Sequence, residues 1–206
     1  MKLFKNIKTF YFDNMNLINK FWLNQIALSI LGIMVCLPMP SFGTAALIIA
    51  SLFSAIFFVS LLYDNAWDEG FKDSNRVSNG RLPLRPFHGA KVAVFAYAPS
   101  ILFWVIWAVP TLLNCIGVET LNAFGVVGKT LVLFFCNGTY LGLVYTTLNY
   151  IDEVYLLLIA LVCFIPAIIS YGLGYRLGLA DKQIKTLFGF KPALGDGAKK
   201  PEKSKK

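Results

Sequence analysis

The side chains that could bind a charged ligand are concentrated in one hydrophilic stretch, YDNAWDEGFKDSNRVSNGRLPLRP, which covers residues 63–86. Its second half could bind a phosphate or a phospholipid head group, because a guanidinium donates two parallel hydrogen bonds to such a group. The residues predicted for this site are Asn75, Asn79, Arg76, Arg81 and Arg85. The simpler interpretation, which we favour, is a solvated connection whose basic side chains lie at a membrane surface.

A helix is predicted for the first half of the same stretch. Asp64, Asp68, Lys72 and Arg76 follow one another at intervals of four, which places acidic and basic groups on one helical face. Such pairs each stabilise a helix by roughly 0.2–0.5 kcal/mol. The sequence SNG at residues 78–80 then predicts the end of the helix.

The residues needed for catalysis or metal binding are scarce. His88 is the only histidine, whereas a metalloprotease or a lipid phosphatase uses several. Carboxylates with magnesium remain an alternative, but the Asp-Gly and Ala-Arg spacing of alcohol phosphotransferases is missing. We therefore expect no catalytic residue, no metal, no cofactor and no enzymatic activity.

The cysteines are expected to be buried structural thiols, because they lie in or beside apolar runs without a C-x-x-C motif. They are Cys36, Cys115, Cys136 and Cys163. A disulfide between the first two is the alternative, since both approach the same face of the membrane.

A second polar feature interrupts an apolar run, TLVLFFCNGTYLGLVYTTL, at residues 130–148. Asn137 and Thr139 could contribute to an embedded polar site of a transporter, lined in part by backbone. A broken helix held by its neighbours explains the same residues and is the interpretation we favour. None of the apolar runs contains an ionisable residue, which argues against coupling to protons or sodium.

The composition predicts an integral membrane protein with an all-α fold. Of 206 residues, 57% are hydrophobic and only 15% are charged, and the mean hydropathy is +0.63. In lipid such apolar runs must be helices, because unpaired peptide groups there cost several kcal/mol. The predicted spans of this polytopic transmembrane helical bundle cover residues 21–37, 44–63, 92–113 and 154–175.

The distribution of charge predicts the topology. The net charge of +8 is concentrated in residues 1–20, residues 64–91 and the chain from Arg176 onward. The positive-inside rule places all three in the cytoplasm, which requires an even number of crossings. We therefore expect four spans plus one membrane-embedded or re-entrant segment at 130–148, and five spans is the alternative.

This topology divides the chain into three parts. Residues 1–20 are predicted to form an amphipathic interfacial helix, or alternatively an arm packed on the loops of the protein. Residues 21–176 form the transmembrane domain with a cytoplasmic loop at 64–91, and residues 177–206 form a basic cytoplasmic tail that is disordered from about residue 195. The protein is expected in the plasma membrane of the cell. Both termini are expected to lie in the cytoplasm.

Two segments resemble those of a known group of proteins. WDEGFKDSNRVSNGR at residues 67–81 and GYRLGLADKQIKTLFGFK at residues 174–191 are similar to segments of small uncharacterised polytopic membrane proteins of Gram-positive bacteria. Those proteins have a Trp-acidic-Gly then Lys-Asp-x-Asn-x-Val pattern and a Gly-Tyr pair before a basic end. The resemblance implies a bacterial membrane protein of this architecture and implies no reaction.

The sequence leaves two functional hypotheses. The first is a non-enzymatic membrane component whose cytoplasmic face engages anionic lipid or a partner membrane protein, because basic and aromatic groups gather there. Nucleic acid is not expected as a partner, since no folded soluble face is available to bind it. The alternative is a small transporter, or the membrane subunit of one, that uses residues 130–148.

Overall fold

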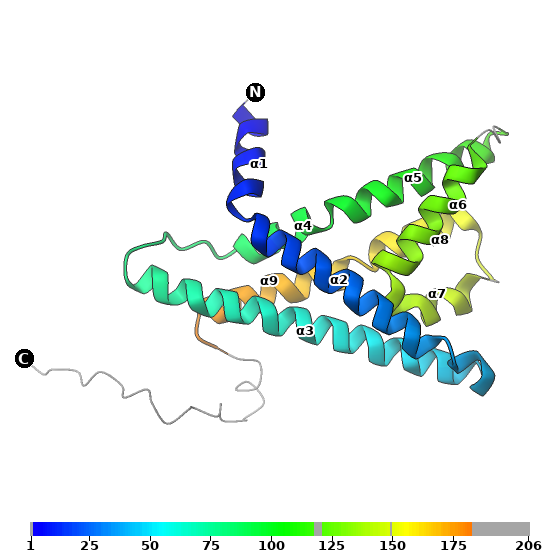
Figure 1. Ribbon diagram of the computed structural model, residues 1–206, viewed down its shortest axis with the longest axis horizontal. Coiled ribbons are helices and arrows are strands. Elements are labelled where there is room, and N and C mark those ends of the chain that lie inside the picture. Colours follow the sequence, from blue (N-terminus) through cyan, green and yellow to red (C-terminus); the bar gives the residue numbers. More distant parts are fainter. Residues whose placement is uncertain (1, 118–120, 149, 183–206) are drawn as a thin grey trace, which may run out of the picture.

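The computed structural model describes residues 2–117, 121–148 and 150–182. Every regular element in these ranges is helical, which confirms the predicted all-α fold (Figure 1). The helices are α1 Lys2–Asp13, α2 Met15–Cys36, η1 Met39–Phe42, α3 Thr44–Ser78, α4 His88–Ala96, α5 Ala98–Cys115, α6 Asn122–Thr130, η2 Leu131–Cys136, η3 Gly138–Tyr140, α7 Leu141–Leu148, α8 Glu153–Val162 and α9 Ile165–Leu179.

Four helical stretches are long and apolar enough to cross a membrane, as predicted. They are Met15–Phe42, Thr44–Ser78, Ala98–Cys115 and Glu153–Leu179. A fifth stretch, Asn122–Cys136 with Gly138–Thr147, is bent by 81° at its break. The chain is therefore a multi-pass α-helical membrane protein with four candidate spans and one bent pair.

Helix α3 is the longest element and continues well beyond its apolar part. Its 35 residues form one unbroken helix, which is about 52 Å long, whereas the hydrocarbon core of a bilayer is roughly 30 Å thick. The predicted helical extension after residue 63 is thus confirmed. The predicted charge pairs differ, because Lys72 and Arg76 bind carboxylates three residues earlier, Glu69 and Asp73, rather than four.

Two of the spans are interrupted before a proline. Helix α4 ends at Ala96 and α5 begins at Ala98 with Pro99 in its first turn, while α9 begins at Ile165 with Pro166 in its first turn. A proline lacks an N–H group and its ring collides with the carbonyl four residues earlier, so the helix breaks just before it. The last predicted span, 154–175, is therefore two helices, α8 and α9.

Helices α3 and α9 pack closely through glycines. A Cβ atom at Gly178 would overlap the carbonyl oxygen of Trp67, and one at Gly70 would overlap the carbonyl oxygen of Tyr175. A Cβ at Gly174 would lie 2.5 Å from the carbonyl oxygen of Tyr63. Backbones in contact at small residues are typical of membrane helices, and here both partners belong to one chain.

Helix α6 runs back along α5 into the bundle. Gly125 lies against Pro110, near the end of α5, and Gly128 lies against Trp107, one turn further in. The carboxylate of Glu153, the first residue of α8, accepts hydrogen bonds from the Lys129 ammonium at 3.1 Å and from the Trp107 indole at 3.2 Å. The start of α8 therefore lies beside the last turn of α6.

After the bend, helix α7 begins against the first turns of α3. Gly142 packs against the carbonyl oxygen of Leu47 in the first turn of α3. Figure 1 shows α6 and α7 on the side of the molecule that also holds the connection between α2 and α3. The bent pair is compatible with the predicted embedded segment and with a broken fifth span. We call its residues, 122–147, the re-entrant segment.

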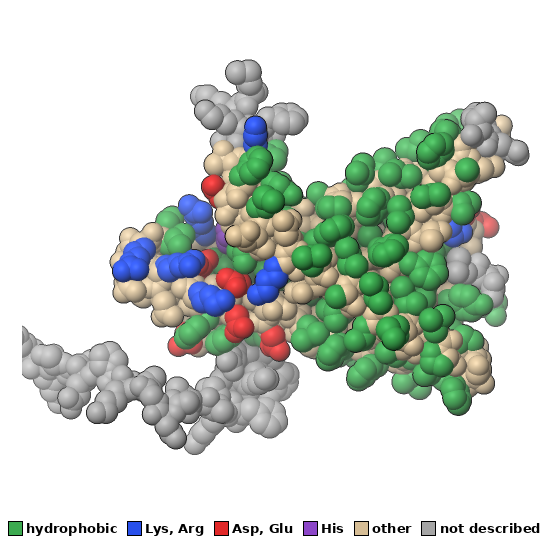
Figure 2. Space-filling view, in the orientation of Figure 1, with side chains coloured by type: hydrophobic (Ala, Val, Ile, Leu, Met, Phe, Trp, Pro, Cys, Tyr) green, Lys and Arg blue, Asp and Glu red, His purple; other side chains and the backbone are tan. Residues whose placement is uncertain are grey.

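The two ends of the bundle differ in charge. Figure 2 shows a broad apolar surface over most of the molecule, with Lys, Arg, Asp and Glu gathered at the end formed by the tip of α3. We call this the charged end. The connection 37–43 between α2 and α3 lies at the other end, which we call the opposite end.

Candidate functional site: a polar cluster at the re-entrant turn

The turn of the re-entrant segment is irregular because its backbone changes helix type twice. A π-helical turn, Leu131–Cys136, leads into Asn137, whose N–H donates to the carbonyl oxygen of Val132 at 2.9 Å. A single 3-10 turn, Gly138–Tyr140, follows before α7 begins. Such departures from the α-helix inside a membrane need neighbours that satisfy the backbone.

Polar side chains from three other helices surround this turn. Helix α2 contributes Gln25 and Ser29, α3 contributes two serines, and α5 contributes one serine from its first turn. Each is at most 1% exposed, like the two polar residues of the turn itself. We call this set the polar cluster: Gln25, Ser29, Ser51, Ser54, Ser100, Asn137 and Thr139.

Part of the polar cluster holds the turn in place by hydrogen bonds. The Gln25 amide donates to the carbonyl oxygen of Cys136 at 3.2 Å and to the Ser100 hydroxyl at 3.3 Å. The Asn137 amide donates to the carbonyl oxygen of Ala160 in α8 at 3.2 Å. These bonds connect the turn to α2 and α8, and through Gln25 to α5, in the observed arrangement.

Ser51 of α3 supports the other side of the turn. Its hydroxyl donates to the carbonyl oxygen of Thr139 at 3.5 Å and accepts a hydrogen bond from the N–H of Leu143 at 3.2 Å. Residues 139 and 143 are left without regular partners by the 3-10 turn. One serine therefore bridges the break between η3 and α7.

Other polar atoms of the same region have no partner among the described residues. Six buried side-chain atoms lack a hydrogen bond: Gln25 Oε1, Ser29 Oγ, Ser54 Oγ, Asn137 Oδ1, Thr139 Oγ1 and the Tyr140 hydroxyl. An unpaired buried polar atom costs about 1–3 kcal/mol, and most such atoms in proteins are paired with protein or water. These six atoms are concentrated around one turn of the chain.

The polar cluster is closely packed. A Cβ atom at Gly32 would lie 2.6 Å from the Cα of Thr139, 2.7 Å from the carbonyl oxygen of Gly138 and 2.8 Å from the Ser54 hydroxyl. A Cβ at Gly138 would overlap the carbonyl oxygen of Ser29. The arrangement is therefore a closed one, in which close backbone contacts surround the unpaired atoms.

The polar cluster is uncharged. Its groups are hydroxyls and carboxamides, which both donate and accept hydrogen bonds. Within the described part of the chain, no three His, Cys, Asp or Glu residues come together in a way that could hold a metal ion. The chemistry on offer is hydrogen bonding to a neutral polar molecule.

The predicted phosphate site lies at the charged end, on and just after the tip of α3. Arg76 is bound to Asp73 at 3.0 Å. The carbonyl oxygen of Asn75 accepts from the Ser78 hydroxyl, and Asn79 follows the last residue of α3. Arg81 and Arg85 are exposed and make no salt bridge with a described residue. The five residues occupy one region of the surface, and no hydrogen bond joins their side chains among those described.

A separate contact network connects four helices at this end. The Tyr175 hydroxyl donates to Asp73 at 2.7 Å, and the His88 ring lies 5.4 Å from the Tyr175 ring and 5.6 Å from the Phe10 ring. Burial lowers the pKa of His88, and Arg85 and Lys91 lower it further, while the carboxylate of Asp73 opposes them. The network joins α1, α3, α4 and α9.

All four cysteines are free thiols, so the alternative of a Cys36–Cys115 disulfide is wrong. Cys36 and Cys136 are buried, and Cys115 is exposed at the end of α5. The prediction of buried thiols is confirmed for Cys36 and Cys136 and is wrong for Cys115, while Cys163 is partly buried.

Sequence reasoning named Asn137 and Thr139 but did not name their partners on α2, α3 and α5. A signal was present in α2, because Gln25, Ser29, Gly32 and Cys36 recur at intervals of four, three and four. This spacing places small and polar residues on one face of an otherwise apolar helix.

Comparison with protein-family models, with curated proteins and with solved structures finds no match for this chain. The function is therefore inferred from the polar cluster itself.

Proposed function

We propose that the protein is a small transporter, or the membrane subunit of one, that lets small uncharged polar solutes cross the membrane through the region of the re-entrant turn. The observation that carries this proposal is the group of six unpaired polar atoms around Asn137 and Thr139, at the break of the bent helix pair.

The energetics of the closed arrangement favour movement. Six unpaired polar atoms at about 1–3 kcal/mol each are a substantial penalty on the closed packing. An arrangement that admits water or a polar solute to the same atoms recovers their hydrogen bonds. The re-entrant segment is the element that can move, because an irregular turn rather than a continuous helix holds it in the bundle.

The class of solute follows from the lining. Hydroxyls and carboxamides match a molecule that carries hydroxyl or amide groups, such as glycerol or urea. An ion would leave its charge uncompensated, since no carboxylate or ammonium belongs to the polar cluster. Uptake of this kind follows the solute gradient and needs no coupling ion.

The variant Thr139→Val tests the proposal. Valine has the same shape as threonine and removes only the unpaired hydroxyl, while the carbonyl oxygen that accepts from Ser51 is kept. A purely structural role predicts an unchanged flux. The proposed role predicts a several-fold lower glycerol or urea flux together with unchanged or higher thermal stability, because removing an unpaired buried hydroxyl relieves its penalty.

The measurement is stopped-flow light scattering of proteoliposomes under gradients of glycerol, urea and water. The matched control is Ser170→Ala, which removes a buried hydroxyl that donates to the carbonyl oxygen of Val59 at 2.7 Å, outside the polar cluster. The control should lower stability and leave flux per folded protein unchanged. Equal flux in wild-type, Thr139→Val and empty vesicles would refute the proposal.

A second function is favoured by the exposed guanidinium groups of Arg81 and Arg85. These groups suit a role as a non-enzymatic component that binds anionic lipid, or an acidic partner protein, at the charged end. In flotation of the full chain with vesicle lipids of matched composition, retention of anionic lipid should fall in the double variant Arg81→Gln with Arg85→Gln. An unchanged preference would rule this role out.

The same proposal includes the location. The protein lies in the plasma membrane in this proposal. The excess of basic residues at the charged end supports an orientation in which that end and both termini face the cytoplasm. The resemblance of residues 67–81 and 174–191 to Gram-positive membrane proteins supports a bacterial plasma membrane.

A further inference from the structure

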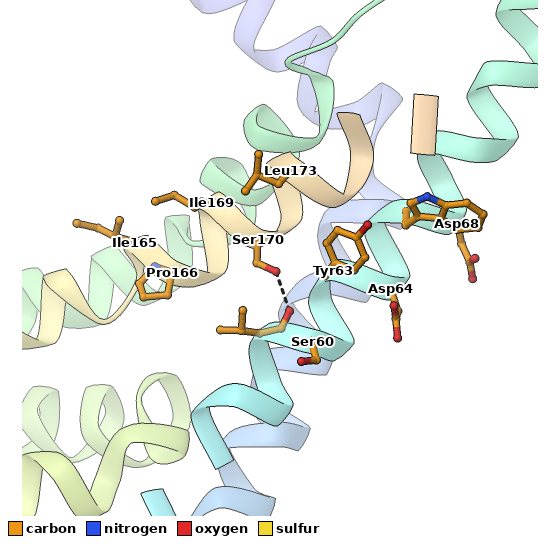
Figure 3. A pocket seen from close by; sticks show the side chains of 11 residues that line it. Ser60, Tyr63, Asp64, Asp68, Ile165, Pro166, Ile169, Ser170 and Leu173 are labelled. Carbon is orange, nitrogen blue, oxygen red and sulfur yellow. Dashed lines mark hydrogen bonds between the residues drawn. The ribbon is translucent and has the colours of Figure 1, made fainter. Parts of the chain in front are cut away.

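A groove of about 940 Å³ opens between α3 and α9 on the lipid-facing surface, away from the polar cluster. Its volume is at the upper end of the range of small-molecule sites, roughly 300–1,000 Å³. Figure 3 shows that α3 and α9 form its two walls, with the hydrogen bond from Ser170 to the carbonyl oxygen of Val59 between them.

One part of the groove is apolar. Along α9 it is lined by Ile165, Ile169 and Leu173, whose side chains are 49%, 54% and 49% exposed. These residues belong to the candidate span Glu153–Leu179, so this wall faces the acyl chains of the bilayer. The chemistry of the wall suits a hydrocarbon chain.

The other part of the groove is acidic and aromatic. Asp64 and Asp68 line it from α3, together with Tyr63 and Trp67 (Figure 3). The carboxylates are one helical turn apart, so they are about 5–6 Å from each other at the level of Cβ.

Neither of these carboxylates forms a salt bridge with a described residue, although Lys72, one helical turn after Asp68, attracts Asp68 electrostatically. Asp64 and Asp68 are exposed and form no salt bridge with a described residue, whereas the neighbouring Glu69 binds Lys72 and Lys20. Two unpaired acids beside interfacial aromatic rings attract a cation that lies at the level of the lipid head groups. The groove therefore joins a site for hydrocarbon to a site for a cation.

We propose that this groove binds a membrane lipid whose head group ends in a protonated amine. The acyl chain lies along Ile165, Ile169 and Leu173, and the ammonium group donates hydrogen bonds to Asp64 and Asp68. A bilayer lipid is the occupant because the apolar wall opens to the hydrocarbon region, where lipid is the surrounding solvent. The groove thus prefers a cationic head group, whereas Arg81 and Arg85 would prefer an anionic one.

The test uses quenching of tryptophan fluorescence by lipids with brominated acyl chains. The full chain is reconstituted in three vesicle sets that differ only in the brominated species: phosphatidylethanolamine, phosphatidylcholine or phosphatidylglycerol. Trp67 lies in the groove, and subtracting the signal of Trp67→Phe isolates its contribution from that of the other tryptophans. Quenching of Trp67 should be strongest for phosphatidylethanolamine and weakest for phosphatidylglycerol.

Substitutions separate the contribution of the lipid head group to binding from the contribution of its acyl chain. Asp64→Asn and Asp68→Asn should each lower the preference for the amine lipid by about two- to five-fold, as expected for partly exposed charge pairs. Asp13→Asn is the matched control, because Asp13 is also exposed at the charged end and lies outside the groove. It should leave the preference unchanged.

The part of the groove that binds the acyl chain is tested by filling it with a larger side chain. Ile169→Trp should reduce quenching by all three lipids, whereas Leu102→Trp, at a position 59% exposed on α5, should not. Because both variants add a tryptophan, each is compared with its own Trp67→Phe double variant.

Three outcomes would overturn the proposal. These are equal quenching of Trp67 by the three lipids, a preference for phosphatidylglycerol, and a lipid preference that survives both Asp→Asn substitutions. If the substitutions change only the protease sensitivity of residues 183–206, the acids serve the basic end of the chain and not a lipid. None of these outcomes depends on solute flux, so the transport proposal is tested separately.

Discussion

Replacing Gly178 by alanine should destabilise the bundle, because α3 and α9 have no room for a methyl group there. The new Cβ would overlap the carbonyl oxygen of Trp67 and lie 2.9 Å from the backbone nitrogen of Phe71. In a helix these two groups form one hydrogen bond. The methyl group would therefore press on an intact turn of α3, and the helices would have to separate.

The magnitude follows from two opposing terms. Overpacking in a closely packed core costs about 1–3 kcal/mol, and alanine recovers roughly 0.5–1 kcal/mol of helix stability relative to glycine. The net destabilisation is about 0–2.5 kcal/mol, and its central value of about 1 kcal/mol corresponds to a fall in Tm of roughly 2–4 °C for a chain of this size.

The assay is thermal unfolding in detergent, followed by the reaction of a thiol-reactive dye with Cys136, which is buried in the folded protein. The matched control on the same helix is Gly172→Ala, whose Cβ would meet only Ala90, with its Cβ at 3.1 Å. Its Tm should stay within about 2 °C of wild type, because a side-chain contact can give by a few tenths of an ångström. Equal Tm values for Gly178→Ala and Gly172→Ala would refute the reasoning.

Two further predictions concern pH and topology. Because the folded state lowers the pKa of His88 below its ordinary value of 6.5, the unfolded state binds more protons below that pH, so stability should be complete above it and fall as the pH is lowered toward the folded pKa. The unfolding midpoint should rise with pH between pH 5 and 7.5 in the wild type, and it should rise less in His88→Gln. Equal dependence on pH in the two proteins would show that His88 is not its source. In a background without native cysteines, single cysteines at Ile116 and Tyr150, which are 74% and 87% exposed, should be labelled from the same side by a membrane-impermeant maleimide, and a cysteine at Arg81 from the other side. Labelling of the first two from opposite sides would indicate five spans.

Hydropathy was sufficient to predict the candidate spans, because an apolar run such as residues 44–63 can satisfy its backbone hydrogen bonds in lipid only as a helix. Charge led to the prediction that residues 130–148 do not cross, since an odd number of spans would separate the basic regions. The bent pair is compatible with this prediction and with a broken fifth span, so the topology stays a prediction. The helical extension of α3 was also readable, because it depends on local spacing from Asp64 to Arg76.

Other features could not be read from local patterns. The contact between Gln25 and Cys136 joins residues 111 positions apart, and hydropathy records Gln25 only as one polar residue in an apolar run. The break between α8 and α9 depends on Pro166, whose effect varies with the neighbours that can accept a kink. The pairing of Lys72 with Glu69 was missed because three- and four-residue spacings are both neighbours on a helix.

Helix α3 has a mechanical consequence because it is continuous from the opposite end to the tip at the charged end. It carries Ser54 in the polar cluster and Asp73, which is bound to Arg76 and Tyr175. About 28 Å of rigid rod separates the two positions, so a tilt of about 5° around one of them displaces the other by about 2.5 Å. Helix α3 thus couples the two positions mechanically. A displacement of Asp73 would move Ser54, which packs against the re-entrant turn.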